Sequence, residues 1–416
     1  MYSEGEELKK GFHNQILLTH MVLLNLTLTS LIIRVLISPI DGYYIDVGCF
    51  KSWFYTASEY GVREFYQKVW CDYPPFNVYI FWIFGSLAKH LSLFGGSHLI
   101  YLIKLPSNLF DLATAYLIFR YLKRNLSLNH GLIGATVYLF NPAMIFNSSI
   151  WGQYDAIYTF FIVFSLTLAL ESKVTFSLVS YALAVLTKPQ AVAFLPILML
   201  LLLCRCDLKD VVKALVAFLT TIMIVILPFR WDNPIDFLLR IYLGGYGQYK
   251  YTSLNAMNFW ALVGINLQDT QQILPYVNYH IVGWILFGVS TIFILTYTKV
   301  EDEYASNPSI VYATFLIFFS FFMFLTRMHE RYLFPAVALS LLALTYSRKL
   351  ALVSTVITTT LLVNQAYALR FLNETMFIPQ GDPLTYAVSS LNLFTILYCY
   401  YLFVRNGERF EGVKGL

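Results

Sequence analysis

The chain is poor in charged residues and in the features that mark soluble or nucleic-acid-binding proteins. Only 12% of its 416 residues are charged and 58% are hydrophobic, whereas soluble domains carry about 25% charged and 45–50% apolar residues. A water-soluble globule is therefore excluded. The basic residues are scattered singly or in pairs, without the Lys/Arg-rich face that nucleic-acid binding needs. No nucleic-acid partner is expected.

Metal-binding motifs are also missing from the sequence. The five cysteines form no CxxC pair and no DxD pair is present, so neither a zinc nor a DxD-type metal site is predicted. His329 lacks the second histidine of an HExxH motif, which excludes metalloprotease chemistry. Cys49 and Cys71, in one polar loop, are the only plausible disulfide pair. We expect no metal and no cofactor.

What the chain does contain is a series of apolar runs. Because about 20 apolar residues span a membrane as a helix, these runs predict an all-α polytopic membrane protein with about 11–13 transmembrane helices. No internal repeat or low-complexity linker is visible, so residues 1–416 are predicted to form one integral membrane domain. The runs cover about 16–38, 76–94, 98–122, 131–148, 156–170, 174–187, 189–204, 211–228, 277–298, 309–326, 332–346, 350–371 and 385–404.

The distribution of basic residues predicts the orientation of these helices. By the positive-inside rule, both termini are cytoplasmic, and the first loop (about 39–75) and the large loop (about 229–256) face outside. We therefore expect a multi-pass protein of the cell membrane with its site on the outer face. Two crossings at 76–94 and 98–122 would put Lys123 and Arg124 on the wrong side. Either that signal is misleading or, as we favour, a segment near 74–97 does not span.

The first outer loop carries candidate acids. Asp46, Phe50, Trp53 and Phe54 fall on one helical face, which predicts an amphipathic surface helix that holds a carboxylate beside aromatic rings. Such a carboxylate can act as a general base on an acceptor hydroxyl. Asp41 is the second candidate. The alternative is that these acids only keep the loop hydrated.

A second polar segment, Trp151-Gly152-Gln153-Tyr154-Asp155, lies at the outer junction of two apolar runs. Ionisable residues at such a depth are costly and indicate function, and Trp, Gln, Tyr and Asp together suit a carbohydrate. The alternative for Asp155 is a helix N-cap.

Two further segments place cations near the membrane. Lys188 and Gln190 belong to the segment Thr187-Lys188-Pro189-Gln190, which breaks a long apolar run. A lysine beside a new helix N-terminus suits a phosphate; a snorkelling lysine is the alternative. In Arg327–Pro335, His329 and Arg331 are candidate phosphate partners, with Glu330 ordering the arginines. An internal ion-pair network is the alternative.

The large outer loop supplies the last candidates. Tyr251, Asn255 and Asn258 offer stacking and hydrogen-bonding surfaces for sugar rings. A purely structural loop explains the same composition.

Six motifs in order resemble a known family. They resemble those of bacterial and archaeal membrane mannosyltransferases related to the second mannosyltransferase of GPI-anchor synthesis. The motifs are D-x(3)-F-x(2)-W, C-D-Y-P-P, W-G-Q-x-D, K-P-Q, N-A-x-N-x-W and M-H-E-R-Y-L-F-P. The resemblance implies a GT-C glycosyltransferase fold with three sets of site residues. The catalytic set is Asp46, Asp41 and Asp155; the donor-phosphate set is Lys188, His329 and Arg331; the substrate set is Trp151, Gln153, Gln190, Tyr251, Asn255, Asn258 and Glu330.

The resemblance predicts an inverting glycosyltransferase. It would move a hexose, most simply mannose, from a dolichyl- or polyprenyl-phosphate donor to a hydroxyl of a lipid-linked or protein-linked glycan, within membrane lipid. A lipid-linked sugar flippase or transporter is the alternative, although no repeated halves are visible. A third possibility is a non-catalytic subunit that positions a synthase, against which the acids of the first loop argue.

Overall fold

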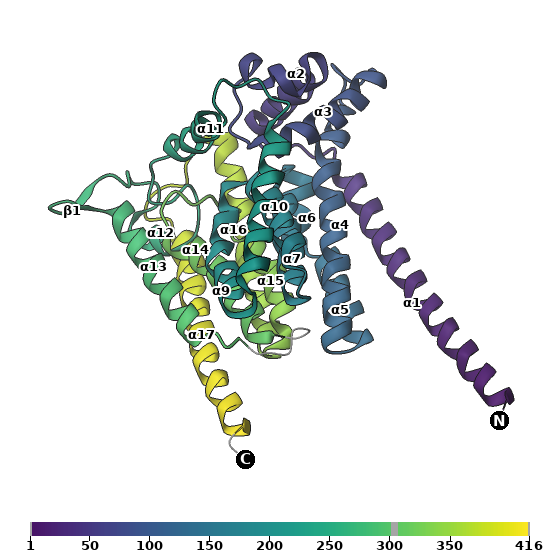
Figure 1. The fold of residues 1–416 in the computed structure, drawn as a ribbon. Helices are drawn as coiled ribbons and strands as arrows, with labels where there is room; N and C mark the ends of the chain where they lie inside the picture. The colour runs from purple at the N-terminus through teal and green to yellow at the C-terminus, as the bar shows by residue number, and fades with distance from the viewer. Residues whose placement is uncertain (1, 301–306, 415–416) are drawn as a thin grey trace.

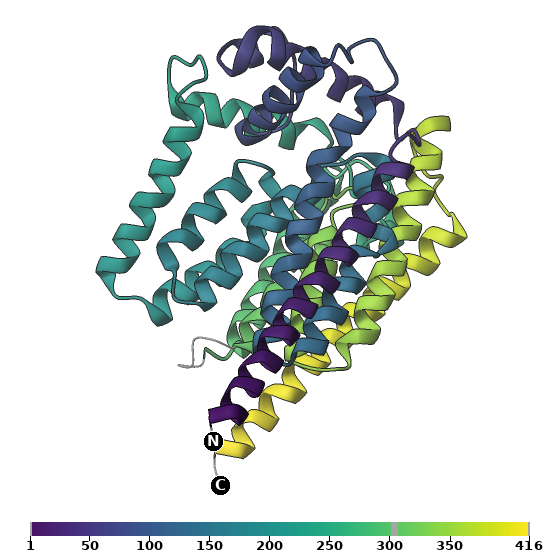
Figure 2. The same ribbon diagram turned by 90° about the vertical axis from the view of Figure 1, so that its right-hand side faces the viewer.

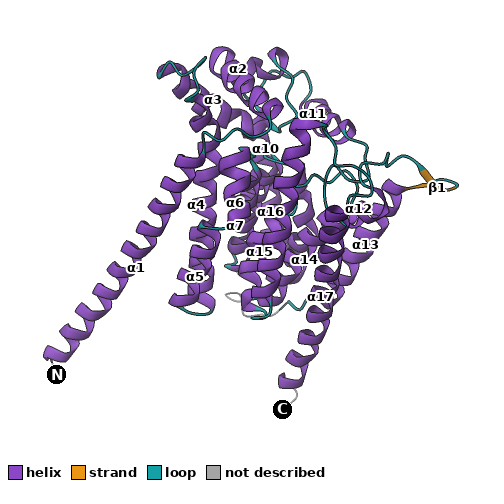
Figure 3. Cartoon of the chain, turned by 180° about the vertical axis from the view of Figure 1, so that it is seen from behind, coloured by secondary structure: helices purple, strands orange, loops and turns teal. Residues whose placement is uncertain are grey.

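The chain folds as a helical membrane protein. A computed structural model describes residues 2–300 and 307–414, and in this part of the chain the only strands are β1 (Gln272–Leu274) and β2 (Val277–Asn278), a small antiparallel pair at the edge of the molecule (Figure 3). The predicted all-helical architecture is confirmed. Five described helices are long and apolar enough to cross a membrane: α1 (Tyr2–Ile37), α4 (Leu99–Asn125), α13 (Tyr279–Tyr297), α16 (Leu350–Glu374) and α17 (Pro383–Lys414). The chain is a multi-pass membrane protein.

Fewer helices reach spanning length than the apolar runs predicted, because several runs are interrupted. The run broken at Lys188 becomes α8 (Val174–Val185), the 3-10 turn η2 (Pro189–Phe194) and α9 (Leu195–Arg205). Proline lacks the amide hydrogen that a continuous helix would need at Pro189. Three further short apolar helices are α7 (Asp155–Leu170), α14 (Pro308–Phe324) and α15 (Phe334–Leu342).

The core of the bundle lies around α14. Every residue from Ser309 to Met323 is buried, and a helix that is apolar on all sides is expected in such a place. The other elements are α5 (Leu128–Leu139), α6 (Pro142–Ile145), the π-helical turn η1 (Phe146–Trp151), α10 (Leu208–Ile226), α11 (Pro234–Gln248), α12 (Phe259–Gly264) and the 3-10 turn η3 (Ala343–Thr345).

The first outer loop and the apolar run that follows it form two helices at one end of the bundle. α2 (Tyr44–Lys68) and α3 (Pro75–His90) pack together above the end where α1 stops and α4 begins (Figures 1 and 2). Phe50, Trp53 and Phe54 are buried beneath α2, as the predicted amphipathic helix requires. α3 lies where a segment that does not cross the membrane is expected, and the C-terminus of α4 then lies at the same end as both chain termini.

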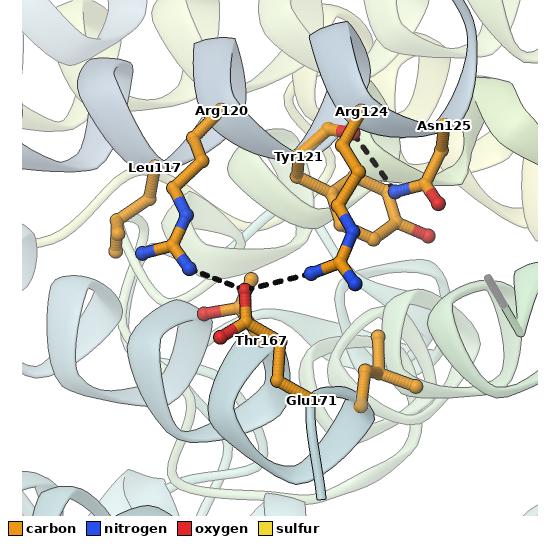
Figure 4. A pocket seen from close by; sticks show the side chains of 8 residues that line it. Leu117, Arg120, Tyr121, Arg124, Asn125, Thr167 and Glu171 are labelled. Atoms are coloured by element: carbon orange, nitrogen blue, oxygen red, sulfur yellow. Dashed lines mark hydrogen bonds and ion pairs between the residues drawn. The ribbon is translucent and has the colours of Figure 1, made fainter. Parts of the chain in front are cut away.

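At that opposite end, ion pairs join α4 to the end of α7. Glu171 accepts hydrogen bonds from Arg120, from Arg124 at 3.1 Å and from Lys173 at 2.7 Å. Figure 4 shows both arginines reaching down from α4 to the single carboxylate. Cations at helix C-termini are favourable because the helix dipole is negative there.

Candidate functional site

A cavity of about 550 Å³ lies between α2 and the end of the bundle on which α2 packs. This volume is in the range of small-molecule binding sites. Its walls come from the first outer loop, η1, the break before η2, the large outer loop and residues 327–332. Aromatic side chains form much of the lining: Tyr43, Phe50, Trp53, Trp70, Tyr73, Trp151, Tyr249 and Tyr251.

Asp46 lies in the first turn of α2 and faces this cavity. Its carboxylate accepts hydrogen bonds from Trp151 Nε1 at 2.9 Å and from Gln153 Nε2 at 2.7 Å. Burial raises the pKa of Asp46, although the positive charge of Arg331 and the Trp151 hydrogen bond act in the opposite direction. Residues more than 100 positions apart therefore form one polar wall.

Close backbone packing places Trp151 and Gln153 against α2. Gly152 adopts a left-handed conformation (φ 85°) directly after η1, which favours glycine. A Cβ on Gly42 would lie 2.5 Å from the Trp151 carbonyl oxygen, so only glycine allows this approach. Buried Lys104 fixes the same junction by donating to three backbone carbonyls, those of Ser38, Ile40 and Ile150.

Asp155 is the centre of a buried ion-pair cluster. It begins α7 but makes no side-chain cap. Instead it accepts hydrogen bonds from Lys188 Nζ at 2.6 Å and from Asn147 Nδ2 at 3.2 Å, and Arg331 Nε lies 3.5 Å away. Lys188 is surrounded by three aromatic rings, each with its centroid 5.8 Å from Nζ: Tyr73, Tyr158 and Tyr332.

Glu330 pairs with Arg331, as the internal ion-pair alternative predicted. Arg331 Nη1 donates to Glu330 Oε1 at 2.5 Å, and His329 Nδ1 lies 3.8 Å from Oε2. Burial alone would raise the pKa of Glu330, but the charges of Arg331 and His329 lower it to about 2. Arg327 bonds to Asp269 instead, so Glu330 orders only one of the two arginines.

The large outer loop uses its asparagines for structure. Asn255 Nδ2 donates to the Met376 carbonyl at 3.0 Å. Asn258 caps α12 by accepting from Trp260 N at 3.1 Å and donates to the Phe322 carbonyl at 2.9 Å. Asn255 still lines the cavity, whereas Asn258 is not among its lining residues.

Of the remaining predicted site residues, some line the cavity and one does not. Tyr251 and Gln190 both line the cavity, and Gln190 Oε1 is buried without a hydrogen-bond partner in the described part of the chain. Asp41 is exposed and does not line the cavity. Of the two first-loop acids proposed as a base, only Asp46 faces it.

Two features of the site were missed in the sequence. Asp72 and Tyr73 line the cavity, and their Cys-Asp-Tyr-Pro-Pro segment was a visible signal. Asp269 accepts from Arg327 Nε at 2.6 Å and lies 3.3 Å from His280 Nδ1. No sequence spacing connects these three residues.

Two carboxylates that line the cavity have no cationic partner among the described residues and can interact with a ligand. Lys188 and Arg331 are engaged with Asp155 and Glu330, whereas neither Asp46 nor Asp72 makes an ion pair within residues 2–300 and 307–414. Burial also raises the pKa of Asp72. Acceptor oxygens between aromatic faces suit hydroxyl or amino groups on a ring. The paired cations are less suited to hold a free phosphate than their positions in the sequence suggested.

Comparison with known proteins identifies a family. No curated protein matches the chain significantly. The family described as "GPI transamidase subunit PIG-U" matches residues 54–263, about half of the chain.

This match corrects the predicted function. The GT-C mannosyltransferase, its flippase alternative, the dolichyl- or polyprenyl-phosphate donor and the glycan acceptor are all wrong. The physical reason is that acidic and aromatic residues in the loops of a membrane protein are not specific to sugar transfer, so the motifs did not distinguish a glycosyltransferase from another membrane protein. That these residues bind a ligand stays a prediction. The chain belongs to the PIG-U family of GPI transamidase subunits.

Proposed function

We propose that this chain is a subunit of a GPI transamidase, the complex that attaches GPI anchors to proteins, and that its cavity holds the glycan part of the GPI lipid. The family match carries the proposal. The membership implies the endoplasmic reticulum membrane in place of the cell membrane, with the cavity on the luminal side. Its partners are then the other subunits and the proteins that receive the anchor.

Many residues of the matched segment line the cavity, which supports a role in substrate binding. Residues 54–263 include several cavity-lining positions from four separate segments, among them Asp72, Trp151, Gln153, Lys188 and Tyr249. The family pattern therefore runs through the walls of the cavity, not only through the lipid-facing helices.

The chemistry of the walls fits a glycan. Asp46 and Asp72 offer carboxylate oxygens to sugar hydroxyl and amino groups, and Tyr249 and Trp151 offer faces for ring stacking. The buried Asp155–Lys188 pair holds the wall in place behind them. In this proposal the first-loop acid binds and does not act as a base for sugar transfer.

The test uses cells that lack the chain and carry a GPI-anchored surface reporter. The tagged wild-type chain should copurify with the other transamidase subunits and restore the reporter. Asp46→Asn should copurify equally well but restore much less reporter, because it removes a charged acceptor and leaves the fold in place.

Asp41→Asn is the matched control, since Asp41 is an acid of the same loop that lies outside the cavity. It should restore the reporter fully. Failure of the wild-type chain to copurify with any transamidase subunit would overturn the subunit assignment. Equal restoration by both variants would overturn the role of the cavity.

A further inference from the structure

Helix α1 is attached to the bundle by one narrow face. Only 11% of its apolar stretch is buried, and Figures 1 and 3 show its N-terminal half diverging from the other helices. The attached face contains Leu23, Ser30 and Arg34, with Arg34 Nη1 2.8 Å from Asp111 Oδ2. Away from this face, most of the described side chains between Leu17 and Ile37 are exposed.

The opposite face of α1 has the spacing of a helix-packing seam. Its residues follow at intervals of three and four, as in a left-handed helix pair, and all of them are exposed. We call them the α1 seam: Leu18, Met21, Asn25, Leu28, Ile32 and Val35. Five are apolar and one, near the middle of the spanning stretch, is an amide.

Asn25 contrasts with three threonines on these long helices. Thr27, Thr355 and Thr359 each donate to the carbonyl four residues earlier in their own helix, at 2.8–3.0 Å. Asn25 has no hydrogen-bond partner in the described part of the chain, although its amide has two donors and an acceptor. An amide left unpaired in hydrocarbon is costly, so another group at the same depth is required.

We propose that the α1 seam packs against a membrane-spanning helix of another transamidase subunit, with Asn25 hydrogen-bonded to it. The inference rests on the proposed function, because it takes its partner from the complex. The partner helix carries an amide or hydroxyl side chain at the depth of Asn25 and an apolar stripe on either side. Polar side chains of this kind join helices in membranes, and a single Asn in an apolar seam sets the register of the pair.

The first test maps the contact in the full chain within its membrane. A photo-cross-linking amino acid at position 28, in the seam, should give an adduct with one membrane subunit of the transamidase. The same amino acid at position 23, on the attached face, should give no such adduct. An adduct of twice the mass of this chain would indicate self-association and overturn the proposal, as would an adduct with lipid alone.

The second test measures copurification of the other subunits with tagged full-length variants. Asn25→Leu should weaken association roughly 3-fold to 15-fold, the effect of losing one hydrogen bond between membrane helices. Asn25→Gln, which keeps the amide, should stay near wild type. Thr359→Val is the matched control, because the Thr359 hydroxyl is already satisfied within α16.

The outcomes separate the two proposals. If the wild-type chain copurifies with transamidase subunits and Asn25→Leu does so equally well, the seam is wrong and the subunit assignment stands. If the wild-type chain copurifies with none of them, the subunit assignment itself fails.

Discussion

Helix α7 has a carboxylate at each end, and the two have different surroundings. Asp155 begins the helix beside the cavity, is 0% exposed, and meets Lys188 and Arg331, whose side chains are 7% and 14% exposed. Glu171 follows the helix at the opposite end and meets three cations that are 47–53% exposed: Arg120, Arg124 and Lys173. Both ends thus gather positive charge, but only one does so away from water.

The difference shows that burial, not the number of ion pairs, decides what a cluster does. A buried pair repays the loss of hydration only while both partners are present, so removing one leaves an uncompensated charge. Exposed pairs are weakened by water and salt. We infer that the Asp155 cluster fixes the cavity wall, whereas the Glu171 cluster has little effect on stability.

The largest effect is expected from Lys188→Met. It leaves the buried Asp155 with only one nearby cation in the described ranges, the more distant Arg331, and should lower the free energy of unfolding by about 3–5 kcal/mol. Thermal unfolding in detergent micelles would measure the loss. Combining it with Asp155→Asn should recover part of the stability, because the buried charge is then gone. A double variant as unstable as the single one would contradict this account.

An intermediate effect is expected on acidification, through Glu330. Its folded-state pKa of about 2 lies below its usual value of 4.5, so the unfolded chain binds the proton more readily. The stability that Glu330 contributes is complete above about pH 4.5 and is lost as the pH falls towards 2. The loss is on the order of a few kcal/mol.

The measurement is thermal unfolding of the wild-type chain and Glu330→Gln between pH 6 and pH 2. The wild-type advantage over the variant should shrink as the pH falls. An advantage that is constant over this range would mean that the carboxylate is not held ionised by Arg331.

The smallest effect is expected from Arg124→Gln at the other end of α7. Glu171 keeps Arg120 and Lys173, and the lost pair is half exposed, so stability should change by less than about 1 kcal/mol. High salt should make even this difference vanish. A loss as large as that of Lys188→Met, measured in the same micelles, would remove the distinction between the two ends.

Much of the architecture was predictable because it depends on local patterns. The apolar runs predicted a helical membrane protein, the spacing of Phe50, Trp53 and Phe54 predicted the surface helix α2, and Pro189 predicted the break at Lys188. The number of long helices was overestimated, because apolar content does not show where a π-helical or 3-10 turn shortens a run.

The function was predicted less well, and the reason is chemical. Acids and aromatic residues that bind a sugar are the same residue types as those that transfer one, so the motifs led to a mannosyltransferase. The family match over residues 54–263 corrected that interpretation.

The sequence by itself determined that this chain is a helical membrane protein with polar segments between its apolar runs, because hydrophobic length and helical periodicity are local properties. Only the tertiary structure decided which charges pair. Lys188 was interpreted as a phosphate ligand, but packing of α7 against α8 and η2 brings it to Asp155, 33 residues away. Asp46 meets Trp151 and Gln153 only because Gly42 allows two backbones to touch. Long-range contacts of this kind depend on shape and burial, which no local pattern encodes.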